Sequence, residues 1–137
     1  MSEPGRDHVG VGVGAYVLNG RQEVFLALRG PEARNESGCW EFPGGTVEFG
    51  ETLEAAVRRE MREEYGMDVT VERLLGVDDH MTEGQHWVSV SFLARHEGGT
   101  PEIREPGKCT AIGWFGEDEL PQPLSLASEA TLRARRA

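Results

Sequence analysis

The chain has 137 residues, 38% of them hydrophobic, and a formal net charge of −10. This length is typical of one domain with its own core, so we expect a single domain over residues 1–137. A strongly acidic chain is a poor partner for nucleic acids and anionic membranes, and no apolar run is long enough to span a bilayer. We therefore exclude both as partners, and the lack of a signal-peptide pattern predicts a cytoplasmic protein.

The first part of the chain predicts a short tail and a β-hairpin. Residues 1–7 are expected to form a flexible tail. Residues 9–18 and 24–28 are apolar and flank Asn19-Gly20, which is typical of a hairpin turn. Residues 29–38 are rich in Gly, Pro, Asn and Ser and predict a loop, after which residues 39–42 predict a short strand.

A helix is predicted over residues 52–65. This stretch lacks Pro and Gly and is rich in Ala, Leu, Glu, Arg and Met, and Gly66 follows as a C-terminal stop. Side chains turn by about 100° per residue around a helix. Leu53, Val57 and Met61 therefore form one apolar stripe that faces a core.

Three carboxylates of this helix, Glu60, Glu63 and Glu64, lie about one turn apart. Glu60 and Glu63 flank the apolar stripe, and Glu64 falls on it, where an unpaired charge is costly. The alternative interpretation is an amphipathic helix with solvated charges, and the position of Glu64 argues against it. Oxygen donors without His or Cys at matching spacing suit Mg²⁺ or Mn²⁺, and Mg²⁺ commonly shares its shell with substrate phosphates. The cluster therefore predicts a metal site for phosphate chemistry.

The remaining elements complete an α/β pattern. Residues 69–77 and 85–96 predict strands joined by a polar loop at 79–85, and residues 97–110 predict a second polar loop. A last strand is expected at 111–115 and a terminal helix at 125–135, with Ser125 as its N-cap. Strands followed by helices in this order favour a mixed sheet between helices.

Residues 45–67, GTVEFGETLEAAVRREMREEYGM, resemble the Nudix box, the signature of the Nudix (MutT-like) hydrolases. The resemblance extends to Trp40-Glu41-Phe42-Pro43-Gly44-Gly45 before the box and to Trp114-Phe115 and Glu119-Leu120-Pro121 after it. It implies an α/β/α sandwich with a mixed sheet. It also implies hydrolysis of a nucleoside diphosphate linked to another group, with a divalent metal ion.

The resemblance also implies roles for individual residues. Glu60 and Glu64 would be the main metal ligands, with Glu63 and the backbone carbonyl of Gly44 as further ones. Arg59 would support these catalytic carboxylates by pairing with Glu51 and holding the loop against the helix.

The general base is left open among three glutamates. Glu60 is the first candidate, and Glu102 and Glu105 on a later loop are alternatives. Metal lowers the pKa of bound water, so a carboxylate of modest basicity suffices.

The substrate is expected to be a small nucleotide. Trp87, His86 and Trp40 are candidates to contact its base, and Arg29 and Lys108, with Arg34, are candidates to offset the acidic field. Tyr16 and Phe49 are instead expected to pack in the core. The family resemblance also suggests a homodimer that uses exposed strand residues near the first hairpin.

The whole-chain pattern resembles nucleoside-triphosphate pyrophosphohydrolases, which release a monophosphate and pyrophosphate. Hydrolysis of ADP-ribose or nucleotide sugars is the alternative reaction. A third possibility is a non-catalytic nucleotide-binding domain, against which the intact carboxylate set argues.

Overall fold

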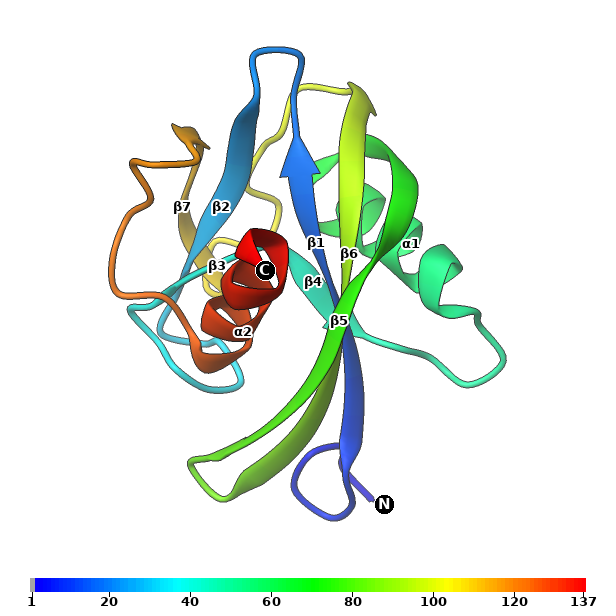
Figure 1. Cartoon of the computed structure of the whole chain (residues 1–137). Helices are drawn as coiled ribbons and strands as arrows, with labels where there is room; N and C mark the ends of the chain where they lie inside the picture. Colours follow the sequence, from blue (N-terminus) through cyan, green and yellow to red (C-terminus); the bar gives the residue numbers. More distant parts are fainter. Residues whose placement is uncertain (1) are drawn as a thin grey trace.

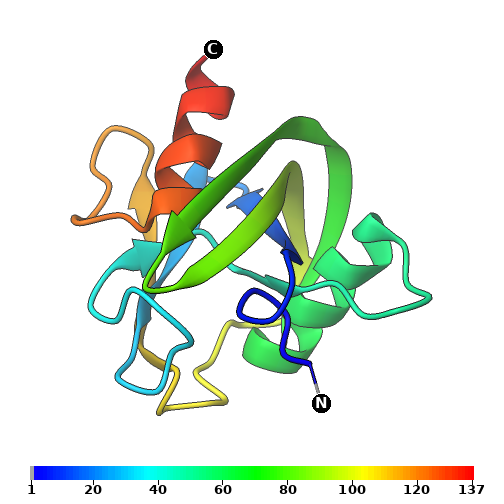
Figure 2. The ribbon, with the colours of Figure 1, turned by 90° about the horizontal axis from the view of Figure 1, so that it is seen from below.

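A seven-stranded mixed sheet lies between two helices in the computed structural model, which describes residues 2–137 (Figures 1 and 2). The α/β/α sandwich with a mixed sheet is therefore confirmed. The elements in chain order are β1 (Gly10–Leu18), β2 (Glu23–Arg29), β3 (Trp40–Glu41), β4 (Gly44–Thr46), α1 (Leu53–Tyr65), β5 (Asp68–Thr82), β6 (Gln85–Gly98), β7 (Cys109–Gly116) and α2 (Leu126–Arg136).

The central strand β1 joins most of the sheet together. The strand order is β3-β2-β1-β6-β5, with β4 paired to β1 and β7 paired to β2. β1 runs parallel to β6, from Gly10 opposite Trp87 to Leu18 opposite Arg95, while its other pairings are antiparallel. This parallel pair makes the sheet mixed and sets β1 beside β6 along its whole length.

Alternation along β1 divides the core into two halves. Val13, Ala15 and Val17 point to the face that α1 covers and pack in one cluster with Met61. Tyr16 points to the opposite face and packs in a second cluster, against which Leu132 of α2 lies. The two helices therefore cover opposite faces of the sheet, as Figure 2 shows.

Helix α1 begins and ends at the predicted positions. The Thr52 side chain accepts a hydrogen bond from the Ala55 amide (3.2 Å), and Gly66 ends the helix in the left-handed conformation (φ 71°). Val57 and Met61 are buried, but Leu53 is 38% exposed, because the first turn extends past the edge of the core. The apolar stripe is thus shorter than expected at its N-terminal end.

The hairpin of β5 and β6 is longer than its sequence suggested. Residues 79–85 were expected to form a polar loop, but strand pairing continues to Thr82 opposite Gln85 and leaves only Glu83-Gly84 in the turn. The polar residues of β5 are compatible with a strand because β5 lies at the edge of the sheet and is mostly exposed. The short strand β4 was also not expected.

The N-terminal residues differ from the flexible tail that the sequence predicts. The Gly5 amide donates to the His8 carbonyl (2.8 Å), and the His86 amide donates to the Gly5 carbonyl (2.8 Å). This turn lies against the indole of Trp87. Met1, the first residue of the predicted tail, lies outside the described residues. No helix within residues 2–137 has the length and apolar character needed to span a membrane.

Replacing Thr52 by Ala tests the contribution of the α1 cap to stability. The change removes the acceptor for the Ala55 amide. We expect the free energy of unfolding to fall by about 1 kcal/mol. Urea unfolding measures the loss, and Thr100→Ala, at an exposed position outside the helices and strands, is the control. Equal stabilities of the two variants would show that the cap contributes nothing.

Candidate active site

Helix α1 brings three carboxylates, those of Glu60, Glu63 and Glu64, to the wall of a large cavity. Glu60 is only 8% exposed, Glu64 is half-buried, and both line a cavity of about 650 Å³. The backbone of β4 approaches Glu60 closely, so a side chain at Gly45 would collide with the Glu60 carboxylate. A side chain at Gly44 would likewise collide with the Val13 carbonyl. Gly44 therefore lets β4 lie directly against β1, and Gly45 lets it lie against the acidic face of the helix.

Arg59 fastens this loop to the helix. Its Nε and Nη2 donate to the two Glu51 carboxylate oxygens (2.7 Å each), and Nη2 also donates to the Thr46 carbonyl (3.0 Å). The expected pairing of Arg59 with Glu51 is present. This bidentate hydrogen bonding lowers the pKa of Glu51 to about 2. Nη1 of Arg59 donates to Glu60 (2.9 Å) and Glu63 (3.2 Å), so one guanidinium joins the loop to the acidic cluster.

The site carries more negative charge than its arginine neutralises. Burial raises the pKa of Glu60 above its ordinary value. Burial, together with the nearby charges of Glu60, Glu41 and Glu105, raises the pKa of Glu64 to about 8. Both shifts mean that the ionised carboxylates are held in an unfavourable environment. A cation bound beside them would relieve that cost.

The donor chemistry fits a hard divalent cation. Buried Glu60 and half-buried Glu64 offer carboxylate oxygens, and the more exposed Glu63 also lines the cavity. As the side chains lie, no three His, Cys, Asp or Glu residues among residues 2–137 converge on one metal position. Arg59 Nη1 contacts both Glu60 and Glu63 and accounts for their present orientation. The proposed ligand set, including the Gly44 carbonyl, stays a prediction.

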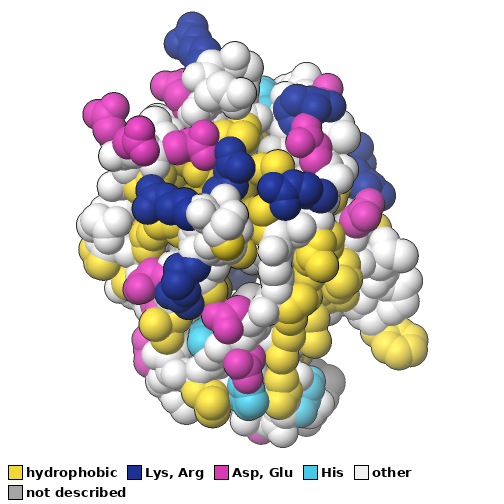
Figure 3. All heavy atoms as spheres, in the orientation of Figure 1, with side chains coloured by type: hydrophobic (Ala, Val, Ile, Leu, Met, Phe, Trp, Pro, Cys, Tyr) yellow, Lys and Arg dark blue, Asp and Glu magenta, His cyan; other side chains and the backbone are white. Residues whose placement is uncertain are grey.

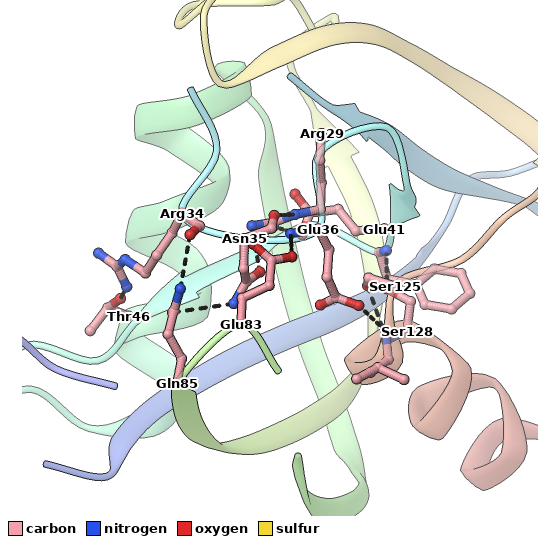
Figure 4. Close-up of polar contacts among 12 residues, drawn as sticks. Arg29, Arg34, Asn35, Glu36, Glu41, Thr46, Glu83, Gln85, Ser125 and Ser128 are labelled. Carbon is pink, nitrogen blue, oxygen red and sulfur yellow. Dashed lines mark hydrogen bonds and ion pairs between the residues drawn. The ribbon is translucent and has the colours of Figure 1, made fainter. Parts of the chain in front are cut away.

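A polar network lines the cavity beyond the carboxylates (Figure 4). Arg29 donates to the Asn35 carbonyl (2.8 Å), to Asn35 Oδ1 (2.9 Å) and to Glu41 (2.7 Å). Gln85 donates to the Arg34 carbonyl (2.9 Å) and accepts from Asn35 (3.3 Å). These bonds tie the loop between β2 and β3 to the start of β6. Because each guanidinium nitrogen of Arg29 is already bonded, Arg29 holds this wall in place.

Of the predicted substrate-binding residues, the structure brings three to the cavity and leaves two outside it. Trp87, Arg29 and Lys108 line the cavity, and the guanidinium of Arg34 lies 4.9 Å from the centre of the Trp87 ring. His86 does not line it, because neighbouring strand residues point to opposite faces. The exposed His86 ring lies 3.4 Å from Asp79 instead.

The other three aromatic residues have distinct environments. The Trp40 ring packs edge-on against Phe115 (5.4 Å) in the α2-side cluster, so it does not line the cavity. Tyr16 is 1% exposed and donates a hydrogen bond to Glu117 (2.6 Å), which agrees with its expected place in the core. Phe49 was expected in the core and is fully exposed, because it lies in the turn between β4 and α1.

The candidates for the general base differ in whether they line the cavity. Glu105 lines the cavity and contributes to the raised pKa of Glu64. Glu102 pairs with Arg104 (2.9 Å) and is not a lining residue. The geometry therefore favours Glu60 and Glu105 over Glu102 as groups that reach the cavity.

Several lining residues were not found from the sequence. The buried amide of Asn35 and the hydroxyls of Ser89 and Ser91 all reach the cavity. The two serines alternate with Val88 and Val90, a pattern that usually indicates a solvent-facing side. Only the place of α2 over that side turns it into a cavity wall. Glu41 could have been found from the sequence, since it lies within the segment before the Nudix box that also resembles the family.

Comparison with known proteins places this chain in a family. The family model for the NUDIX domain matches residues 8–134. The chain belongs to the Nudix family. A MutT Nudix hydrolase from Burkholderia pseudomallei has a solved structure with a TM-score of 0.84 and 39% identity, covering 93% of this chain and 98% of that one.

Two curated relatives carry names that describe a reaction. An 8-oxo-dGTP diphosphatase from Proteus vulgaris is 35% identical over 109 residues, which is 80% of this chain and 93% of the relative. An 8-oxo-dGDP phosphatase from Homo sapiens is 35% identical over 113 residues, which is 80% of this chain but 33% of the relative. The chain therefore spans about a third of the human protein and most of the Proteus one.

Replacing Glu64 by Gln separates charge from packing at this site. The volume of the side chain is nearly unchanged while one carboxylate is lost. We expect kcat at saturating Mg²⁺ to fall on the order of 10²-fold, since metal-dependent charge stabilisation contributes several kcal/mol. The melting temperature in EDTA should not fall, because the variant no longer buries a charge with a raised pKa.

Steady-state kinetics and thermal unfolding measure the two effects. Glu54→Gln is the matched control, because Glu54 lies on the exposed face of the same helix. Wild-type kcat in Glu64→Gln would show that Glu64 does not act at the metal.

Proposed function

We propose that this protein is a metal-dependent hydrolase of small nucleotides that cleaves a phosphoric anhydride bond. The nucleoside triphosphate is the favoured substrate, and the monophosphate and pyrophosphate are the products. The observation that carries the proposal is the pair of carboxylates, buried Glu60 and half-buried Glu64, on the wall of a cavity of about 650 Å³. The cavity is large enough for a nucleotide and opens directly over the acidic cluster.

Each part of the site has a role in this reaction. A divalent ion held by Glu60, Glu63, Glu64 and the Gly44 carbonyl would neutralise phosphate charge and lower the pKa of water. Glu60 is the first candidate to accept the proton of the attacking water, and Glu105 is the alternative. Arg59 positions Glu60 through its hydrogen bond (2.9 Å).

Positive charge for the phosphates must come from few residues. Lys108 and Arg34 line the cavity and have no carboxylate within ion-pair range among residues 2–137. Figure 3 shows that basic and acidic side chains are mixed on the α2 face of the molecule. The attraction for a polyphosphate is therefore local to the cavity and depends on the metal.

The names of the relatives support cleavage between the α and β phosphates. That bond converts a triphosphate to a monophosphate and pyrophosphate, and a diphosphate to a monophosphate and phosphate. Cleavage of this one bond would therefore account for both names, the diphosphatase from Proteus vulgaris and the phosphatase from Homo sapiens. Both names refer to oxidised guanine nucleotides, so 8-oxo-dGTP belongs first in a substrate panel.

The second candidate is hydrolysis of ADP-ribose or a nucleotide sugar. An ADP-ribose pyrophosphatase from Methanocaldococcus jannaschii is 39% identical over 88 residues, covering 62% of this chain and 50% of that one. This match covers less of the chain than the match to the 8-oxo-dGTP diphosphatase, which supports the triphosphate reaction.

A homodimer also stays a prediction. Exposed apolar residues occur at the start of β1 and along β5, namely Val9, Val11, Leu74, Val77 and Met81.

Metal removal tests the catalytic centre. We expect turnover to cease in EDTA and to return with Mg²⁺ or Mn²⁺, because the buried carboxylates need a cation to hold phosphate nearby. Mg²⁺ should also raise the melting temperature of the wild type more than that of Glu64→Gln, since binding to the folded state stabilises it. Undiminished turnover in metal-free buffer would contradict the assigned site.

The products identify the bond that breaks. A dNTP panel that includes 8-oxo-dGTP, run in ¹⁸O-labelled water, should yield monophosphate and pyrophosphate, because only the phosphates lie over the acidic cluster. Chromatography and mass spectrometry measure the products and the position of the label. Inorganic phosphate as the first product of a triphosphate would exclude this cleavage. An inert dNTP panel beside rapid ADP-ribose hydrolysis would favour the second candidate.

A further inference from the structure

The loop between β6 and β7, residues 99–108 (the 99–108 loop), lies against the C-terminal end of the helix that carries the acidic cluster. Its first residue, Gly99, has a φ of 79°, and a Cβ there would collide with the Gly66 carbonyl. Further along, the Glu102 amide donates a hydrogen bond to the Tyr65 carbonyl (3.0 Å). The backbone of the loop therefore meets the end of α1 in two places.

Arg104 makes a third contact with this end of the helix. Its Nη1 donates to the Arg62 carbonyl (2.8 Å), and its guanidinium covers Gly66, where a Cβ would lie 2.6 Å from Nη2. A cation is favoured there, because the last carbonyls of a helix carry partial negative charge. Arg104 also pairs with Glu102 (2.9 Å), but the two side chains are 46% and 63% exposed, so this ion pair contributes little. The contact of Arg104 with α1 is therefore the one that holds the loop.

The far end of the 99–108 loop is held by the loop that follows β2. The Gly30 amide donates to the Lys108 carbonyl (2.8 Å), and the Glu32 amide donates to the Gly107 carbonyl (2.9 Å). In Figure 2 the 99–108 loop (yellow) accordingly reaches from α1 to the loop after β2. The loop is thus fixed at both ends.

Two side chains between these fixed points reach the cavity. Glu105 and Lys108 line it, whereas Arg104 does not. The Lys108 amide donates to the Glu105 carbonyl (3.0 Å), so one turn holds both residues. Arg104 precedes Glu105 in the chain and binds the turn of α1 that carries Glu63 and Glu64. Arg104 therefore connects the helix carboxylates to the two charged groups that the loop contributes.

We propose that Arg104 is a positioning residue of the active site: by binding the end of α1, it sets where Glu105 and Lys108 stand relative to the helix carboxylates. The inference rests on the proposed nucleotide hydrolysis. Lys108 is thereby held where its ammonium meets substrate phosphate. Glu105, the alternative proton acceptor, is held close enough to Glu64 for their charges to interact. Misplacement of such groups by about 1 Å can lower a rate on the order of 10²-fold.

Arg104→Met tests the inference, because it removes the guanidinium and keeps most of the side-chain length. We expect kcat/KM for dGTP, or for ADP-ribose if the dNTP panel is inert, to fall roughly tenfold as Glu105 and Lys108 lose their positions. Arg104→Lys keeps a charge beside the Arg62 carbonyl and should restore most of the loss. Steady-state kinetics at saturating Mg²⁺ measure both variants. Arg95→Met removes an exposed guanidinium from β6 and, as the matched control, should keep the wild-type value.

A double-mutant comparison separates positioning from stability. In a Glu105→Gln/Lys108→Met background, Arg104→Met should change kcat/KM by less than about twofold, because the groups that it positions are already gone. Its effect on the melting temperature should be the same in both backgrounds. An equal kinetic loss in the two backgrounds, or no loss in the wild type, would overturn the inference.

Amide hydrogen exchange gives a readout that does not need turnover. In Arg104→Met the amides of Glu102 and Lys108 should exchange faster, since their hydrogen bonds belong to the loop that is released. The Met67 amide, bonded within the end of α1, should exchange at the wild-type rate. Unchanged exchange at Glu102 and Lys108 would refute the positioning role. Absence of nucleotide turnover by the wild type would instead refute the proposed function, and the exchange rates would still show whether Arg104 holds the loop.

Discussion

The acidic face of α1 is the constraint on which the rest of the site depends. Glu60 is buried and Glu64 half-buried on one side of a helix, and their mutual repulsion adds to the cost of desolvation. Arg59 offsets part of this cost, and its other N–H groups donate hydrogen bonds to Glu51 and Thr46. The same guanidinium therefore stabilises the charges and fixes the loop that must lie over them. Loss of the Arg59 side chain would leave the carboxylates without this stabilisation and would free the loop.

Glycine serves two different purposes around the cavity. At Gly44 a side chain would collide with the backbone of Val13, so glycine there is a requirement of the fold, and at Gly45 a side chain would displace the Glu60 carboxylate. At Gly12 there is space for a side chain, and the strand would gain from one. Glycine at this position leaves open volume on the cavity wall. This contrast distinguishes a glycine that packing requires from one that does not have this constraint.

The sequence predicted the parts of the structure that depend on local chemistry. The α1 helix follows from its helix formers, its Thr52 cap and its Gly66 stop, and the carboxylates on it follow from the spacing of Glu60 and Glu64. Parts that depend on long-range packing were not predicted. Trp87 and His86 are adjacent in the chain, and only the position of α2 decides which of them faces the cavity. Phe49 has the composition of a core residue, but the turn that carries it leaves the sheet altogether.

The cavity wall shows why polar residues in alternation are ambiguous. Ser89 and Ser91 alternate with valines as residues on a solvated face do, and β5 with its exposed edge has the same pattern. The two strands differ in what lies above them. One helix and the network of Arg29, Asn35 and Gln85 enclose the space over β6, so its hydroxyls face a ligand-sized volume. The carboxylates that we propose for phosphate chemistry thus come from one short segment of sequence, whereas the polar groups around the rest of the cavity are brought together only by the fold.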